Sequence, residues 1–84
     1  MEDIMEQIKL LSASVTEDAY NTSLEQGYEL LVRLRELGAD KDSVYRTLSE
    51  YFNSLEDGMS YDFMADVLDF VVGYCSPERF IWDV

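Results

Sequence analysis

The sequence has no histidine, a single cysteine, one proline and only six basic residues among 84. Without histidine, the chain lacks the side chain that most often serves as a general base or a metal ligand near neutral pH. Because Cys75 is the only cysteine, no internal disulfide can form, and no imidazole is present to activate the thiol as a nucleophile. We therefore expect Cys75 to be a half-buried structural residue, and we predict that the protein is not an enzyme.

Long hydrophobic stretches are also missing. No apolar run approaches the roughly 18 residues that a membrane-spanning helix needs. The first ten residues, MEDIMEQIKL, lack the basic and apolar regions of a secretory signal peptide. Together with the single cysteine, these absences predict a protein of the reducing cytoplasm.

Positive charge is scarce, because 18 acidic residues face six basic ones and the net charge is −12. Nucleic acids are bound mainly through Lys and Arg that neutralise phosphates, and anionic membrane surfaces attract the same residues. We therefore expect neither nucleic acid nor a membrane surface as a partner. A field of this sign attracts basic proteins and cations instead.

What the sequence does contain is helical periodicity in a largely apolar chain. Ile4, Ile8, Leu11 and Val15 follow the spacing of one helix face, and no segment alternates with the period of a strand. The length of 84 residues suits a single domain, 1–84. The prediction is an all-α fold, a compact bundle of about four helices joined by short connections.

Capping signals predict where the second and third helices begin and end. Ser14 and Thr22 each precede a glutamate by three residues, which is the spacing of a capping box, so the second helix should begin at one of them. Gly38 is a favourable residue just beyond its end. Asp40 or Asp42 should cap the third helix.

Similar signals predict the fourth helix and the tail. Asp57 or Ser60 should cap a helix that continues to about Tyr74. Pro77 then begins a short last segment, in which we expect the ring of Trp82 to close one end of the core.

The segment YDFMADVLDF, residues 61–70, carries three aspartates and no cation. At about 100° per residue, Asp62, Asp66 and Asp69 fall within about 60° of one another, opposite an apolar arc. We therefore expect the arc to face the core and an acidic stripe to face outward. No Lys or Arg occurs between Thr47 and Pro77. The predicted partner-binding residues are Glu50, Glu56, Asp57, Tyr61, Asp62, Asp66 and Asp69.

Two other interpretations of these carboxylates stay open. The stripe can be a solvated face without a partner, and the N-terminal group Glu2, Asp3 and Glu6 can form the interface instead. A metal site is not indicated. SLEDGMSYDFMAD lacks the ligand spacing of an EF-hand, and bundle di-metal sites require histidine, so we expect no metal and no cofactor.

A local resemblance concerns LGADKDSVYRTL, residues 37–48. It resembles the attachment site of acyl carrier proteins, a family of small acidic four-helix proteins that carry phosphopantetheine on a serine after an aspartate. That resemblance implies modification of Ser43. Lys41 and Asp42 interrupt the family's usual run, and a periodic helix replaces its long preceding loop. Asp and Ser are also common helix caps, which would explain the segment without any carrier function.

The chain as a whole resembles another group, the small acidic helical immunity proteins of bacterial contact-dependent and polymorphic toxin systems. The segment DVLDFVVGYCSPERFIW, residues 66–82, carries this resemblance best. It implies a partner, the toxin domain of a neighbouring gene, often a basic nuclease. Neutralising such a toxin is the leading hypothesis. A nucleic-acid mimic that inhibits a nuclease, or a carrier protein modified at Ser43, are the alternatives, and the sequence leaves open a monomer or a homodimer.

Overall fold

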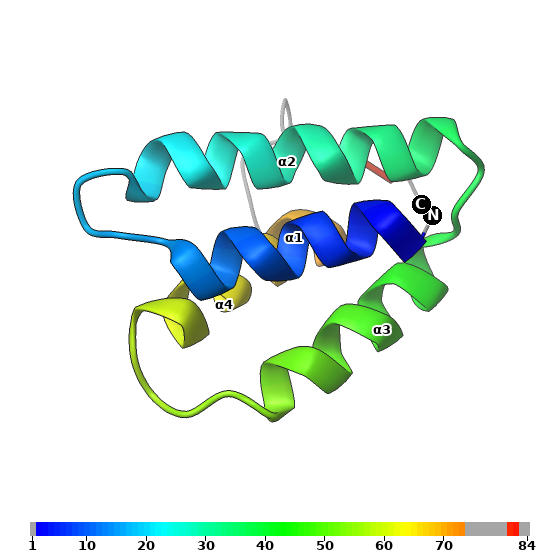
Figure 1. Cartoon of the computed structure of the whole chain (residues 1–84). Coiled ribbons are helices and arrows are strands. Elements are labelled where there is room, and N and C mark those ends of the chain that lie inside the picture. Colours follow the sequence, from blue (N-terminus) through cyan, green and yellow to red (C-terminus); the bar gives the residue numbers. More distant parts are fainter. Residues whose placement is uncertain (1, 74–80, 83–84) are drawn as a thin grey trace.

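Four helices make up most of the chain. The computed structural model describes residues 2–73 and 81–82. The helices are α1 (Glu2–Ser14), α2 (Tyr20–Glu36), α3 (Lys41–Asn53) and α4 (Met59–Val72). Each helix runs roughly antiparallel to the one before it, and α4 lies behind α1 in the view of Figure 1. No strand occurs in the described ranges, so the predicted all-α bundle is confirmed.

Helix α4 is the centre of the core because it contacts each of the other three helices. Its apolar arc is buried as predicted, and α1, α2 and α3 add smaller sets of aliphatic residues. The radius of gyration is 11.8 Å, close to the roughly 12 Å expected for a compact chain of this length. The buried apolar residues are Ile4, Ile8, Leu31, Leu34, Val44, Leu48, Phe63, Met64, Val67, Leu68, Val71 and Ile81.

The connection between α2 and α3 follows its sequence signals. Gly38 adopts a left-handed conformation with φ of 95° just after α2, as expected for a residue beyond a helix end. Asp40 is the N-cap of α3, and its carboxylate accepts a hydrogen bond from the backbone N–H of Ser43 at 2.7 Å. This bond lowers the pKa of Asp40.

The predicted starts of α2 and α4 are wrong. Helix α2 begins at Tyr20 after Ala19, whose side chain offers no cap, and the hydroxyl of Ser14 instead donates to the carbonyl of Leu10 within α1. Helix α4 begins after Gly58, again without a side-chain cap. In both places the contacts of α4 with the other helices outweigh a local cap, since packing supplies most helical stability in proteins.

The end of α4 also differs slightly from the prediction. The helix stops at Val72, and Gly73 closes it in a left-handed conformation with φ of 88°. Tyr74, Cys75 and Pro77 lie outside the described residues. Trp82 packs against the core and donates from its indole N–H to the carbonyl of Ala39 at 3.1 Å, so its predicted place at one end of the core is confirmed.

Candidate functional site

Two loops, residues 15–19 and 54–58, lie at the same end of the bundle. They lie at the left of Figure 1, where α1 and α3 end and α2 and α4 begin. Ser12 and Ser60 join α1 to α4 there. The Ser12 hydroxyl donates to the Ser60 carbonyl at 3.1 Å, and the Ser60 hydroxyl donates to the Ser12 carbonyl at 2.7 Å. The two loops are therefore held at a fixed separation.

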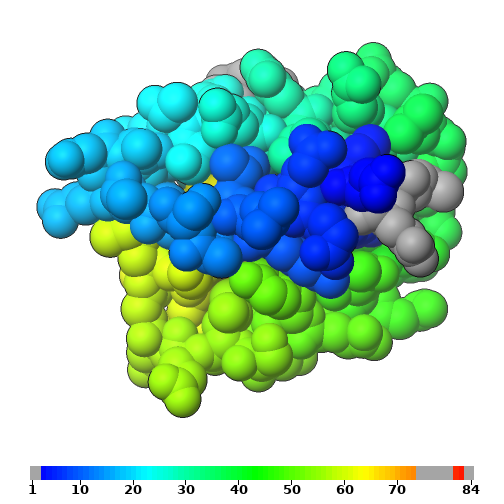
Figure 2. All heavy atoms as spheres, in the orientation of Figure 1, coloured from blue at the N-terminus to red at the C-terminus, as the bar shows by residue number. Residues whose placement is uncertain are grey.

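Exposed carboxylates gather at this end, on both loops and on the helix turns beside them. The loops form the left side of the surface in Figure 2. We call this group the acidic end; its members are Glu17, Asp18, Glu50, Glu56, Asp57 and Asp62.

The basic side chains of the described residues lie elsewhere. Arg33 and Arg35 are in the last turn of α2, and Lys41 is the first residue of α3, so all three belong to the opposite end of the bundle. Arg46 and Lys9 lie within α3 and α1. No Lys or Arg of the described ranges lies in the loops of the acidic end, so its negative charge is not locally neutralised.

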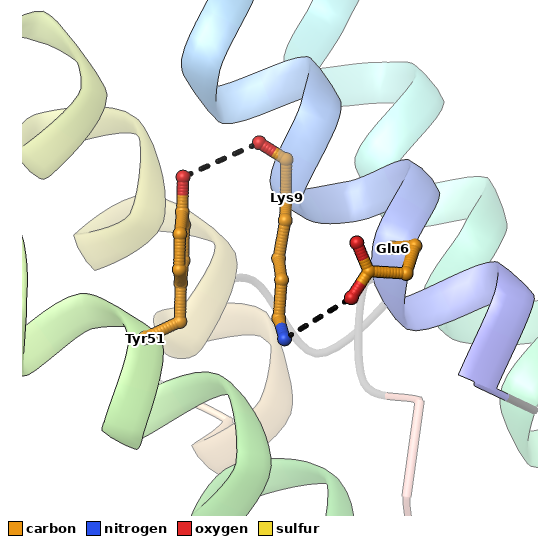
Figure 3. A network of polar contacts seen from close by, with 3 residues as sticks. All are labelled: Glu6, Lys9 and Tyr51. Carbon is orange, nitrogen blue, oxygen red and sulfur yellow. Dashed lines mark hydrogen bonds and ion pairs between the residues drawn. The ribbon is translucent and has the colours of Figure 1, made fainter.

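Lys9 is held against its own bundle. Figure 3 shows its side chain between Glu6 and Tyr51. Its ammonium lies 3.5 Å from a Glu6 carboxylate oxygen and 5.7 Å from the centre of the Tyr51 ring, while the Tyr51 hydroxyl donates to the Lys9 carbonyl at 3.4 Å. Glu6, one of the alternative interface residues, is therefore partly neutralised. Asp3 is exposed, and the side chain of Glu2 lies outside the described part.

Asp66 has a partner within the protein. The hydroxyl of Tyr20, the first residue of α2, donates a hydrogen bond to the Asp66 carboxylate on α4. The same Tyr20 ring packs edge-on against Phe63, with ring centres 5.8 Å apart. Burial, this hydrogen bond and the nearby carboxylates all raise the pKa of Tyr20 above its ordinary value of 10.0. Asp66 therefore fastens α2 to α4, a role that the sequence did not suggest.

The three stripe aspartates consequently differ from one another. Asp62 is exposed as predicted, but Asp66 and Asp69 are half-buried because α2 packs beside this side of α4. Burial, and secondly the charge of Asp66, raise the pKa of Asp69. The stripe therefore faces outward at Asp62 and only in part at Asp66 and Asp69.

The other predicted site residues divide in the same way. Glu50, Glu56 and Asp57 are exposed members of the acidic end. Tyr61 is half-buried, and its ring packs on Phe52 of α3 with centres 4.4 Å apart, so its role as an anchor for a partner stays a prediction.

Sequence reasoning missed Glu17 and Asp18. They are about forty residues from Asp57 in the chain, and only the antiparallel path of α1 and α2 brings their loop to the same end. The sequence does indicate a second acidic segment here, because residues 10–32 contain several Asp and Glu but no Lys or Arg.

Ser43, the residue of the carrier alternative, is exposed in the first turn of α3. Its hydroxyl donates to the Asp40 carboxylate at 3.1 Å, and its backbone N–H makes the cap described above. A groove of about 690 Å³ adjoins it, lined by α1, α3 and the loop before α3. The cap accounts for Asp40 and Ser43 without any modification.

The described residues contain neither a candidate metal cluster nor a candidate membrane span. In residues 2–73 and 81–82, no group of three or more His, Cys, Asp or Glu side chains is arranged to hold a metal ion. Within the same ranges, no helix combines the length and apolar character needed to cross a membrane.

Comparison with known proteins adds no relative. No family model matches the chain, and no curated protein or solved structure matches it either.

Proposed function

We propose that this protein is an immunity protein that binds a basic toxin domain through its acidic end and blocks the toxin by occupying its cationic surface. The observation that carries the proposal is the acidic end, where six exposed carboxylates lie and no Lys or Arg of the described ranges occurs in the two loops. Arg33, Arg35 and Lys41 lie at the opposite end, together with the exposed carboxylates of Glu36, Asp40 and Asp42.

Such an arrangement suits fast capture of a cationic partner. Six exposed carboxylates at one end, in a chain of net charge −12, attract a cationic partner before contact, and electrostatic steering of this kind speeds association by about 10- to 1,000-fold. A general gain in solubility would not require the cations to be kept away from one end, since surfaces of mixed charge are soluble as well.

Asp66 and Asp69 are poor reporters of this function. Reversing Asp66 would leave the Tyr20 hydroxyl without its acceptor, so a loss of binding could follow from a disturbed fold. Asp57 and Asp62 are better reporters because they are exposed members of the acidic end and their carboxylates make no hydrogen bond to another helix of the described residues.

The first step of the test is capture of the partner from a lysate of the native host at low and high salt, followed by intact-mass analysis of bait and prey. One stoichiometric basic protein, released more readily at high salt, is the expected result. The purified pair is then used to measure association rates.

In the second step, Asp57→Lys with Asp62→Lys should slow association at least about tenfold and flatten its salt dependence. Asp3→Lys with Asp42→Lys, two exposed carboxylates at the opposite end of the bundle, is the matched control because it changes the net charge by the same amount. Unchanged association in the first variant, or an equal loss in both, contradicts the proposal.

The same experiment separates the alternatives. Capture of many unrelated DNA-binding proteins would favour a nucleic-acid mimic, which would use the same charge. A bait that carries a phosphopantetheine-sized mass on Ser43, with no protein partner, would favour the carrier function. The groove beside Ser43 is the observation that supports this alternative.

A further inference from the structure

A groove of about 720 Å³ runs along the junction of α1 and α2. Both helices lie on the face of the molecule shown in Figure 2. The residues that line the groove are Ile4, Gln7, Leu10, Leu11, Ser14, Gln26, Glu29, Leu30, Arg33, Glu36 and Leu37. None of the six residues of the acidic end is among them, so this surface is distinct from the acidic end.

The groove contains the most exposed large apolar side chains of the described residues. Leu10 is 64% exposed and Leu37 is 57% exposed, whereas the next, Tyr45 and Met59, lie elsewhere on the surface. Leu10 on α1 and Leu37 just beyond α2 leave apolar area in water, and covering that area with a bound partner favours binding.

The shape of the groove fits a helix. Its lining residues repeat at three- and four-residue intervals on α1 and again on α2, so two antiparallel helix faces form its walls. From Ile4 to Ser14 the wall is about 15 Å long, at 1.5 Å per residue, which corresponds to about three helical turns. Amphipathic helices bind grooves of this kind through residues spaced one helical turn apart.

Charge specifies the occupant further. Glu29 and Glu36 lie seven residues, or about two turns, apart on the same wall, and both are exposed. Arg33 lies between them and disfavours a continuous basic run opposite. A second copy of this chain would bring another net charge of −12 to the contact, so charge opposes self-association here.

From these observations we infer that the α1–α2 groove binds an amphipathic helix of a partner protein. The apolar face of that helix covers Leu10 and Leu37, and two Lys or Arg residues about seven positions apart pair with Glu29 and Glu36. This surface goes beyond the proposed function, because it does not require the acidic end.

The test uses the full chain and a designed probe. The probe is a labelled peptide of about 16 residues, built of Leu, Ala, Gln and two Lys, with leucines on one helical face and the lysines seven residues apart beside it. A second peptide has the same composition in scrambled order. Affinity is measured by fluorescence anisotropy, and the site is mapped from shifts of backbone amide resonances on addition of the probe.

The ordered peptide should bind at least about tenfold more tightly than the scrambled one and should shift amides of α1 and α2. Leu10→Ser with Leu37→Ser should weaken binding at least about tenfold, as expected when the most exposed apolar contacts of the groove are removed. Tyr45→Ser, an exposed apolar residue on α3, is the control and should leave affinity within about twofold.

Reversing the charges of Glu29 and Glu36 tests how far electrostatic attraction contributes to binding of the probe. Glu29→Lys with Glu36→Lys should weaken binding and remove its salt dependence, while Asp57→Lys with Asp62→Lys, an equal change in net charge, should not. Three results would overturn the inference: equal binding of the scrambled peptide, amide shifts confined to the acidic end, or sedimentation showing a dimer that Leu10→Ser with Leu37→Ser dissociates. The last result would assign the groove to a second copy.

Discussion

The hydroxyl of Tyr20 donates to the carboxylate of Asp66, and this bond joins the first residue of α2 to the third turn of α4. The two residues are 46 positions apart in the chain. Because the Tyr20 ring also packs on Phe63, the bond aligns α2 with the central helix at the end where the acidic loops lie. Asp66, which the sequence predicts to bind a partner, therefore helps to hold the helices in place beside the acidic end.

Removal of the Tyr20 hydroxyl should therefore cost stability. Tyr20→Phe keeps the ring contact but leaves a half-buried carboxylate without its donor, so we expect the free energy of unfolding to fall by about 1–2 kcal/mol. Urea unfolding followed by circular dichroism measures the loss. Tyr45→Phe, at an exposed tyrosine, is the control. If both variants lose the same amount, the bond to Asp66 contributes nothing.

Asp69 should make stability depend on pH in a defined direction. Its pKa is raised in the folded protein, mainly by burial and then by the charge of Asp66, so the folded state binds its proton more readily than the unfolded state. The charged form therefore destabilises the fold above the folded pKa, and this cost disappears as pH falls toward the ordinary value of 3.8. Asp69→Asn should be more stable than the natural chain at pH 7.

The measurement is the difference in unfolding free energy between Asp69→Asn and the natural chain across the acidic range. That difference should shrink as pH approaches 3.8 from above. Asp57→Asn, at an exposed loop carboxylate, should show no such pH-dependent difference. A constant gain for Asp69→Asn at every pH would contradict the assignment of the cost to its charge.

Gly27 offers a stabilising substitution. It lies buried inside α2, and an added Cβ would meet Val67 at 3.6 Å and Phe63 at 3.7 Å, which are ordinary contact distances. Gly27→Ala should raise the free energy of unfolding by about 0.5–1 kcal/mol, because alanine is the better helix former and the space exists. Gly27→Leu should destabilise by about 1–3 kcal/mol, because the larger side chain would overpack Val67 and Phe63. Thermal unfolding distinguishes the two outcomes, and a loss with alanine would show that α2 and α4 are already packed too closely.

The sequence predicted those parts of the fold that depend on local signals. Periodicity identified four helices, and Gly38 and Asp40 marked the connection between α2 and α3 correctly. The starts of α2 and α4 could not be predicted in the same way, since both depend on contacts between distant parts of the chain. Tyr20 at the start of α2 bonds Asp66, 46 residues away, and Ser60 at the start of α4 bonds Ser12 of α1 across 48 residues. Two of the six residues of the acidic end could not be predicted either. Asp62 is exposed as the helix wheel suggests, whereas Glu17 and Asp18 reach the same end only through the antiparallel path of the chain.

The acidic end itself should cost stability. Its exposed carboxylates repel one another without a nearby Lys or Arg among the described residues, and salt screens such repulsion over about 10 Å at 0.1 M. Glu56→Lys should therefore raise the free energy of unfolding by about 0.5 kcal/mol at low salt, and the gain should shrink at high salt. Glu29→Lys, next to Arg33 on α2, should give no gain. If Glu56→Lys stabilises the protein and also slows capture of a basic partner, the negative charge serves binding and lowers the stability of the fold. If Glu56→Lys leaves stability unchanged at low salt, the six carboxylates are too far apart to act as one surface.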